Sequence, residues 1–317
     1  MPPEKSIIVA RLDGGLGNQM FQYAMARALA LQCGAPLYLD AGAYSHFTTR
    51  KYALGVFNIA ATIAAPVDVS PFKPGGPKNI GSLVRSLAEK SPTRLVTMAK
   101  RLVPRRLIRK LGAGSPAASE FLFREQEPFV FDEAVISARP PIYLEGYWQN
   151  ENYFVRHRDI ILRDFTLRTP LSEKAGAYKE MIQRSPSVSL HIRRGDYVHS
   201  AARDLFGGVC DIGYYNSALA LLKSKIPDVS VYVFSDEIAW ARANLSHANT
   251  VFLEQCTDYE EMFLMSRCEH NIIANSSFSW WGAWLNTNTK KIVIAPRRWH
   301  KTGGNALTPV PASWTRL

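Results

Sequence analysis

Short apolar runs alternate with longer amphipathic segments throughout the second half of the chain. The apolar runs have the length of buried strands and lie at residues 187–193, 229–235, 250–253, 271–274 and 291–295. The segments between them have helical length and spacing and lie at residues 213–226, 237–245, 258–268 and 278–286. Strict alternation of strand and helix predicts a parallel sheet with helices on both faces.

The first half of the chain begins in the same way and then becomes irregular. Apolar runs at residues 7–12 and 36–40 flank a glycine-rich turn and an alanine-rich helical stretch at 19–33. A further strand is predicted at 141–149. We therefore predict a second, less regular α/β unit in this half.

Two domains fit the length and composition. A chain of 317 residues is about twice the usual domain size, and 47% hydrophobic residues are sufficient for two cores. We place the domains at residues 1–168 and 169–317, joined by a predicted helix at 171–184. The four cysteines form no C-x-x-C pair, which argues against a zinc site or a disulfide framework.

Most of the net charge lies in one segment. Of a formal charge of +11, residues 73–114 contribute +10, with eleven basic side chains and one acid. Apolar residues are interspersed there, which predicts a basic helical insertion that either contacts an anionic membrane or carries a solvated basic face. The chain outside this segment is nearly neutral, which argues against a nucleic-acid partner. Because no apolar run is long enough for a signal sequence or a spanning helix, we expect a cytoplasmic protein that touches at most the inner face of the membrane.

Polar side chains cluster where the predicted strands of the second half end, the edge at which open parallel sheets bind ligands. Paired arginines suit a diphosphate, a helix N-terminus offers N–H groups to the same anion, and an acid can accept hydrogen bonds from guanine or ribose. The alternative is that the charged residues form surface salt bridges and the serines only cap a helix. The pattern predicts a nucleotide-diphosphate site formed by His191, Arg193, Arg194, Asp196, Ser235, Asp236, Asn275, Ser276, Ser277, Phe278 and Ser279.

A glycine-rich turn follows the first strand of the chain, at the corresponding edge of the first domain. Gly15 and Gly17 allow close approach of a ligand, and their spacing matches the start of the dinucleotide fingerprint G-x-G-x-x-G. Met20 stands where the third glycine would be, so the match is imperfect. We interpret the turn as a loop that faces the second domain and directs Asn18 toward the nucleotide site. An NAD-linked sugar-nucleotide enzyme is the alternative.

Five motifs together resemble the bacterial and animal galactoside α1,2-fucosyltransferases, glycosyltransferase family 11. They are GGLGNQMFQYA at 14–24, YLEGYWQNENYF at 143–154, HIRRGDY at 191–197, VFSDE followed by a tryptophan at 233–240, and NIIANSSFSWWGAWLN at 271–286, within a resemblance that runs from residue 7 to about 300. It implies a GT-B architecture, with two Rossmann-like domains facing across a cleft. It also implies GDP-fucose as donor, inversion at the fucose anomeric carbon, and no requirement for a metal or other cofactor.

The resemblance also assigns roles to individual residues. Arg193 and Asn18 are implied as catalytic, with Arg193 at the donor phosphates and Asn18 reaching donor and acceptor from the first domain. His191 and Asp236 are implied beside guanine and ribose. Asp196 is expected to orient the arginines rather than act as a base, because a paired carboxylate stays ionised.

The acceptor side is less defined. The expected acceptor is the 2-hydroxyl of a terminal β-galactose on a surface polysaccharide or oligosaccharide. We expect Tyr147, Trp148 and Gln149 to contact it, with interdomain packing as the alternative for the aromatic residues. Helical spacing predicts core packing for Trp280, Trp281 and Trp284.

No catalytic base is assigned from the sequence. Asp13, Asp40 and Glu145 lie near strand ends of the first domain, where acids also occur in ordinary turns and on surfaces. A non-catalytic module that binds glycans or nucleic acid remains a further alternative to a transferase, and binding of GDP would distinguish the two.

Overall fold

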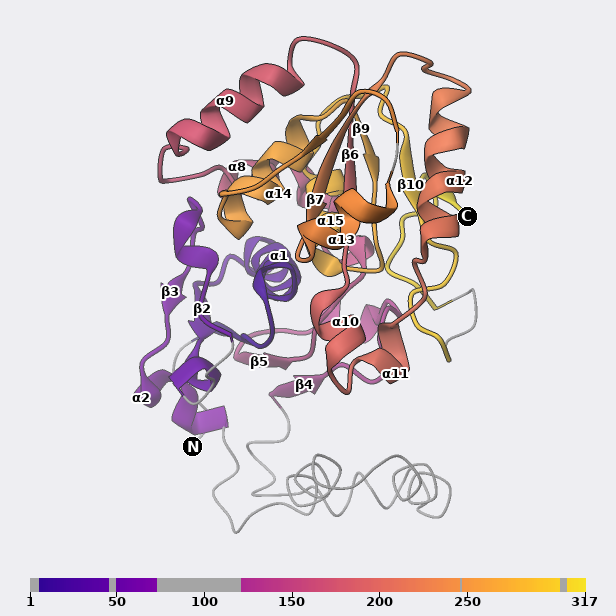
Figure 1. Ribbon diagram of the computed structural model, residues 1–317. Helices are drawn as coiled ribbons and strands as arrows, with labels where there is room; N and C mark the ends of the chain where they lie inside the picture. The colour runs from indigo at the N-terminus through magenta and orange to yellow at the C-terminus, as the bar shows by residue number, and fades with distance from the viewer. Residues whose placement is uncertain (1–5, 46–49, 73–120, 246, 303–306) are drawn as a thin grey trace.

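The computed structural model describes residues 6–45, 50–72, 121–245, 247–302 and 307–317, and they form two parallel sheets (Figure 1). The sheet of the N-terminal half has the strand order β3-β2-β1-β5-β4. The sheet of the C-terminal half has the order β11-β10-β9-β6-β7-β8. Every strand pair within the two described sheets is parallel, as the alternation of strands and helices predicted for the second half.

The N-terminal sheet is short-stranded, and one long helix covers it. Its strands are β1 (Ile8–Arg11), β2 (Leu37–Asp40), β3 (Thr62–Ile63), β4 (Leu122–Arg124) and β5 (Ile142–Glu145). The long helix is α1 (Leu16–Cys33), which ends because Gly34 adopts the left-handed conformation at φ 62°. The shorter helices are α2 (Pro66–Val69), α7 (Glu133–Ile136) and α8 (Arg158–Asp164), with 3-10 turns η1 (Gly42–Ser45), η2 (Leu54–Val56), η3 (Ser70–Phe72), η4 (Glu151–Tyr153) and η5 (Val155–His157).

The C-terminal sheet is built around β6, whose residues are all buried. Its strands are β6 (Ser187–Ile192), β7 (Ser230–Ser235), β8 (Thr250–Phe252), β9 (His270–Ile272), β10 (Val293–Ala295) and β11 (Thr315–Arg316). The helices of this half are α9 (Glu173–Ile182), α10 (Gly195–His199), α11 (Arg203–Phe206), α12 (Ile212–Lys223), α13 (Ile238–Asn244), α14 (Asp258–Arg267) and α15 (Ser277–Trp284).

The predicted strands and helices of the second half are confirmed, with ends that differ by up to three residues. In the first half, the strand predicted at 141–149 is too long. It ends at Glu145, because the chain turns at Gly146 and Trp148 adopts φ 55°, a left-handed conformation incompatible with a strand. The predicted domain boundary at residue 168 lies in the connection between α8 and α9. The predicted basic insertion at 73–114 lies outside the described residues.

One hydrophobic core joins the two halves. Helix α1 packs on β1 and β2 and also against α15, so α1 lies between the two sheets (Figure 1). Trp280, Trp281 and Trp284 are each at most 1% exposed, and the indole N–H of Trp281 donates to the carbonyl of Gly17 at 3.0 Å. The core position predicted for these three tryptophans is confirmed.

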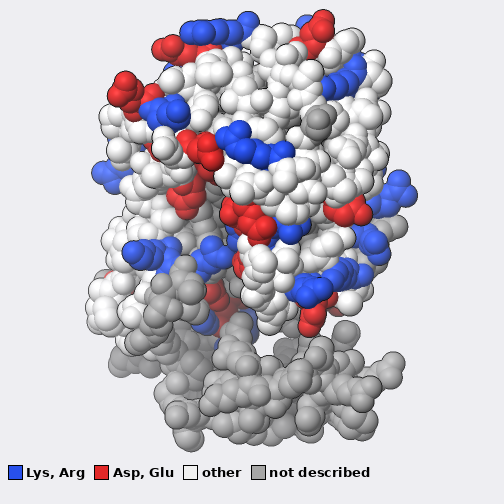
Figure 2. All heavy atoms as spheres, in the orientation of Figure 1, with Lys and Arg blue, Asp and Glu red and all other residues white. Residues whose placement is uncertain are grey.

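Basic and acidic side chains are interspersed over the described part of the face shown in Figure 2. This distribution agrees with the near neutrality of the chain outside residues 73–114. Among the described residues, no helix combines the length and the apolar character needed to cross a membrane.

Candidate active site

A cavity of about 610 Å³ lies between the two halves. The N-terminal half lines it with the start of α1 and the loops after β4 and β5, and the C-terminal half with residues that follow β6, β7 and β9. The volume is typical of small-molecule sites. The predicted architecture, two α/β units that face each other across a cleft, is confirmed.

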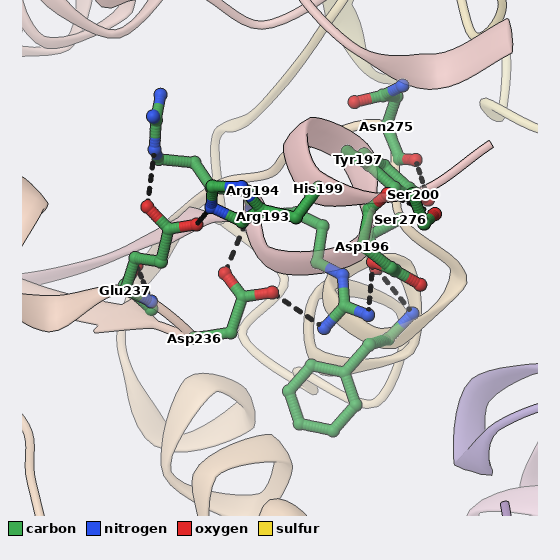
Figure 3. A network of polar contacts seen from close by, with 12 residues as sticks. Arg193, Arg194, Asp196, Tyr197, His199, Ser200, Asp236, Glu237, Asn275 and Ser276 are labelled. Atoms are coloured by element: carbon green, nitrogen blue, oxygen red, sulfur yellow. Dashed lines mark hydrogen bonds and ion pairs between the residues drawn. The ribbon is translucent and has the colours of Figure 1, made fainter. Parts of the chain in front are cut away.

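Arg193 follows β6 and presents a fixed positive charge to the cavity. One guanidinium nitrogen donates to Asp196 at 2.7 Å, and another lies 3.0 Å from Asp236, so two carboxylates hold the group from both sides (Figure 3). The predicted contact between Asp196 and Arg193 is therefore present. A guanidinium held in this way keeps its orientation before any ligand arrives.

Two helices begin beside this arginine. A side chain at Gly17 would place its Cβ 2.6 Å from the Ser277 carbonyl carbon, so only glycine allows the starts of α1 and α15 to approach this closely. Asn18 connects them: its side-chain oxygen accepts from the Ser277 hydroxyl at 2.7 Å and from the Gln149 amide at 2.9 Å. Helix N-termini attract anions, and two of them converge here with Arg193.

Comparison with known proteins agrees with a site of this kind. Residues 126–305 match the model of the family described as glycosyl transferase family 11. The chain is 33% identical to the "Alpha-1,2-colitosyltransferase" of Escherichia coli, over 98% of this chain and 99% of that protein.

The chain belongs to glycosyl transferase family 11. It is also 31% identical to the "O-antigen biosynthesis glycosyltransferase WbnK" of Escherichia coli, over 96% of this chain and 99% of that protein. The "Galactoside alpha-(1,2)-fucosyltransferase 2" of Rattus norvegicus is 31% identical over 44% of this chain and 42% of its own length. The predicted family is confirmed, and relatives with this name are consistent with the predicted enzyme class, galactoside 2-alpha-L-fucosyltransferase.

Two solved structures show a low similarity to the chain. The fucosyltransferase NodZ from Bradyrhizobium superposes with a TM-score of 0.47 and 16% identity, over 88% of this chain and 92% of that one. POFUT1 in complex with GDP-fucose gives a TM-score of 0.48 and 12% identity, over 92% and 96%.

Most of the predicted site residues of this family 11 enzyme line the cavity. They are Gly15, Gly17, Asn18, Tyr147, Gln149, His191, Arg193, Asp196, Ser235, Asp236, Ser276, Ser277 and Phe278. The predicted set is therefore largely brought together from five separate segments of the chain. Four predicted residues do not line the cavity: Trp148, Arg194, Asn275 and Ser279.

Arg194 was predicted in the nucleotide-diphosphate site but does not line the cavity. Its Nε donates to Glu237 at 3.0 Å and its guanidinium lies 3.9 Å above the ring of Trp240, on the far side of the chain from Arg193 (Figure 3). Arg194 is the N-cap residue of α10, where the chain turns with φ −130° and ψ −64°, and the two adjacent arginines therefore reach different partners. The backbone N–H of Arg194 donates to Asp236 at 2.9 Å and thereby helps to position that carboxylate.

The other three predicted residues that do not line the cavity are buried and have structural contacts. Asn275 is 1% exposed and donates to the backbone carbonyls of Phe206 and Trp299, both at 3.1 Å. Ser279 is also 1% exposed, and its hydroxyl donates to the Ser276 carbonyl. Trp148, predicted to contact the acceptor, is 1% exposed and packs in the core. Of the predicted acceptor residues, Tyr147 and Gln149 remain in the cavity.

His191 lies deep in the cavity wall. It is 4% exposed, its ring is 5.5 Å from that of Phe278, and its Nδ1 has no hydrogen-bond partner among the described residues. Burial, with the charge of Arg193 adding to it, lowers the pKa of His191 to about 3. The imidazole is therefore neutral at physiological pH and available for a hydrogen bond to a neutral ligand group.

The sequence-based candidates for a base do not reach the cavity. Glu145 pairs with Arg11 and, at 2.6 Å, with Arg124. Asp40 is buried and accepts from the hydroxyl of Tyr143 at 2.7 Å. Neither these residues nor Asp13 is among the described lining residues.

The cavity also contains residues that the sequence reasoning missed. Arg50 pairs with Asp196 at 3.1 Å from the N-terminal side, and Glu125 follows β4. Asp258 and Glu261 line the cavity from α14. Burial first, and then the charges of Asp258 and Asp236, raise the pKa of Glu261 to about 8. Within the described ranges, no three His, Cys, Asp or Glu side chains are grouped so that they could hold a metal ion.

Proposed function

We propose that this family 11 enzyme transfers L-fucose from GDP-fucose to the 2-hydroxyl of a terminal β-galactose on a surface polysaccharide or oligosaccharide. The transfer inverts the anomeric carbon and needs no metal. The observation that carries this proposal is the charge of Arg193, fixed by Asp196 and Asp236 where the N-termini of α1 and α15 meet.

This arrangement suits the departure of GDP. When the bond between fucose and diphosphate breaks, negative charge collects on the leaving phosphate. A preorganised cation and helix N–H groups stabilise that charge more than they stabilise the ground state. The loss of one such donor costs about 3 to 4 kcal/mol of transition-state stabilisation. In this proposal Arg193 supplies the charge that a divalent metal provides in many other transferases.

The remaining lining residues are proposed to hold the nucleotide and the acceptor. His191, which is neutral, and Asp236 are proposed to form hydrogen bonds with the amide and amino groups of guanine or with a ribose hydroxyl, as the motif resemblance implied. Tyr147 is 40% exposed at the opposite wall, where its ring can stack on a sugar. The relatives named for O-antigen biosynthesis and for galactoside transfer support a galactose-containing acceptor.

Colitose is the second candidate for the transferred sugar. The Escherichia coli relative that is 33% identical to this chain, with 99% of its length matched, is named as a colitosyltransferase. A nucleotide-activated colitose is therefore compared with GDP-fucose in the same assay.

The decisive experiment is an acceptor panel with GDP-fucose, with and without EDTA, followed by linkage analysis of the product. We expect an α1,2-linked fucosyl galactoside in both conditions. Arg193→Ala should lower turnover by about 10² to 10³-fold, and Arg193→Lys should also be impaired because lysine lacks the bidentate fork. Normal turnover in Arg193→Lys would contradict this role. Absence of GDP binding in calorimetry would favour an NAD-linked enzyme or a non-catalytic module.

We also propose that the basic segment at residues 73–114 contacts an anionic membrane. Its eleven basic side chains support this, at about 1 kcal/mol per lysine or arginine near the surface. Replacement of Arg101, Arg105, Arg106 and Arg109 by glutamine should reduce flotation with anionic liposomes. Unchanged flotation would reject membrane contact.

A further inference from the structure

The cavity has one acid on its N-terminal wall among the described residues, whereas Arg193 lies on the C-terminal wall. Among the described lining residues, Glu125 is the carboxylate contributed by the N-terminal half. The acids on the other wall follow β7 or lie on α10 and α14 of the C-terminal half. An inverting transfer brings the acceptor oxygen to the face of the sugar away from the departing diphosphate. We place that acceptor on the N-terminal wall, which carries Glu125.

The chain after β5 is built around this carboxylate. One oxygen of Glu125 accepts the backbone N–H of Tyr147 at 2.7 Å, and the other accepts that of Trp148 at 3.1 Å. A Cβ at Gly146 would lie 2.4 Å from the Cβ of Glu125, so the turn closes tightly over the side chain. Trp148 adopts φ 55° to make this turn, an uncommon conformation for a bulky residue. Strained backbone of this kind is found where a side chain must be held in place.

The turn also connects Glu125 to the centre of the site. The residue after Trp148 is Gln149, whose amide donates to Asn18 at 2.9 Å. Asn18 in turn accepts from Ser277 at the start of α15. Glu125 is thus held by the same turn that contacts the junction of the two helix N-termini.

Glu125 differs from the acids around Arg193. Asp196 and Asp236 are both engaged by that guanidinium, at 2.7 and 3.0 Å. Glu125 has no lysine or arginine partner within the described part of the chain, and each of its oxygens keeps a lone pair. Burial raises the pKa of Glu125 above the usual carboxyl range, which brings it closer to the value that suits a base at neutral pH.

We propose that Glu125 is the general base of the transfer. This inference rests on the proposed function and specifies its second half. The acceptor oxygen forms a bond to C1 of fucose while the bond from C1 to the β-phosphate oxygen breaks, and that electron pair leaves with GDP. The hydroxyl proton passes to the carboxylate of Glu125 and from there to solvent.

The central variant is Glu125→Gln, which keeps an oxygen that can accept a backbone hydrogen bond but cannot take up the proton. We expect transfer to the galactoside to fall by about 10² to 10⁴-fold, with the dissociation constant of GDP unchanged. Azide, a nucleophile that needs no deprotonation, should release GDP from GDP-fucose at the same rate in variant and wild type. Glu125→Asp should retain more transfer than Glu125→Gln.

Two matched variants serve as controls. Glu127→Gln removes an exposed carboxylate from the same loop and should leave transfer unchanged. His300→Gln removes another titratable group of the cavity wall, whose ring packs against Phe129 at 5.1 Å and Phe206 at 4.7 Å. Near-normal transfer in Glu125→Gln would overturn the proposal, as would a large loss confined to His300→Gln. Equal losses of transfer and azide-driven release in Glu125→Gln would assign Glu125 a structural role instead.

The proposed function and this inference fail in distinguishable ways. If the wild-type protein binds GDP but transfers fucose to no galactoside, the proposed function is wrong, whatever the variant does. If the wild type is active and Glu125→Gln is equally active, only the assignment of the base is wrong.

Discussion

Arg193 and Arg194 show how strongly one position in the chain changes the chemistry of a side chain. Arg193 faces the cavity between two carboxylates, while Arg194 packs on Trp240 and pairs with Glu237. The two residues are connected through Asp236. The backbone N–H of Arg194 donates to the Asp236 carboxylate, and that carboxylate orients the guanidinium of Arg193. The proposed phosphate site thus contains one arginine aimed at the ligand and one that supports it.

At the same scale, the raised pKa of Glu261 leads us to expect that nucleotide binding depends on pH. With its pKa raised to about 8, Glu261 is neutral at pH 7 and becomes ionised as the pH rises through 8. The ionised form adds negative charge beside Asp258 and Asp236 and repels a diphosphate. We expect the affinity for GDP to fall by about three- to tenfold between pH 7 and pH 9.

Calorimetry with GDP across this range measures the effect, and Glu261→Gln is the control whose affinity should not change with pH. An identical pH dependence in both proteins would contradict the assignment. The sign for folding is the same: the raised pKa of Glu261 stabilises the folded protein fully below the ordinary value of 4.5, and this contribution is lost progressively as the pH rises from there to about 8.

At the scale of elements, the contact between α1 and α15 depends on one missing side chain. Gly17→Ala would place a Cβ 2.6 to 2.7 Å from backbone atoms of Ser277 and Phe278, and backbone cannot yield as a flexible side chain can. We expect a loss of about 1 to 3 kcal/mol in the free energy of unfolding, because overpacking forces the two helices apart. The rate of transfer should fall by more than the loss of folded protein explains, since the same displacement moves Asn18 away from Ser277.

The matched control is Gly176→Ala in α9, where the added Cβ has no neighbour within 4 Å among the described residues. That substitution should be neutral or stabilising by up to about 1 kcal/mol, because alanine favours a helix. Chemical denaturation of both variants, with transfer assayed in parallel, makes the comparison. Equal behaviour of the two alanine variants would mean that the approach of α1 and α15 is not sterically required.

The elements also explain what the sequence could and could not predict. Residues such as Arg193, Asp236 and Ser276 follow strands of a parallel sheet, and parallel topology brings all strand ends to one edge. Local pattern was therefore sufficient to place them. Glu125 and Arg50 lie in irregular connections of the first half, whose path is set by tertiary contacts and not by periodicity.

The misplaced residues have equally local causes. The apolar run after Glu145 reads as a continuing strand, but the turn at Gly146 rotates Trp148 into the core and leaves Tyr147 and Gln149 in the cavity. The turn of the chain from β6 into α10 separates Arg193 from Arg194. In both cases a motif identified the right segment, and the backbone direction decided which of its residues face the ligand.

At the scale of the whole molecule, an ion pair crosses the cleft. Arg50 reaches from the N-terminal half to Asp196, which also holds Arg193. Both partners are more than a third exposed, so the pair itself stabilises the fold by at most about 1 kcal/mol. Its position in the cavity gives it a larger effect on an anionic ligand than on folding.

We expect Arg50→Gln to leave the unfolding free energy within about 1 kcal/mol of wild type. The same substitution should weaken GDP binding by about three- to tenfold, because a cation near the diphosphate is lost. The control is Arg242→Gln, which breaks a similarly exposed pair with Glu254 away from the lining residues. If both substitutions change GDP affinity equally, Arg50 does not act on the nucleotide.

The tryptophan core has a consequence for how the protein is made. Phe21 on α1 lies 4.4 Å from the ring of Trp280 and 5.0 Å from that of Trp281, so α1 completes its packing only with residues near the other end of the chain. About 250 residues are synthesised between the end of α1 and the end of α15, which takes roughly 12 to 50 seconds at typical translation rates. Throughout that interval the apolar side of α1 lacks its partner. We therefore expect the nascent chain to depend on chaperones until α15 leaves the ribosome.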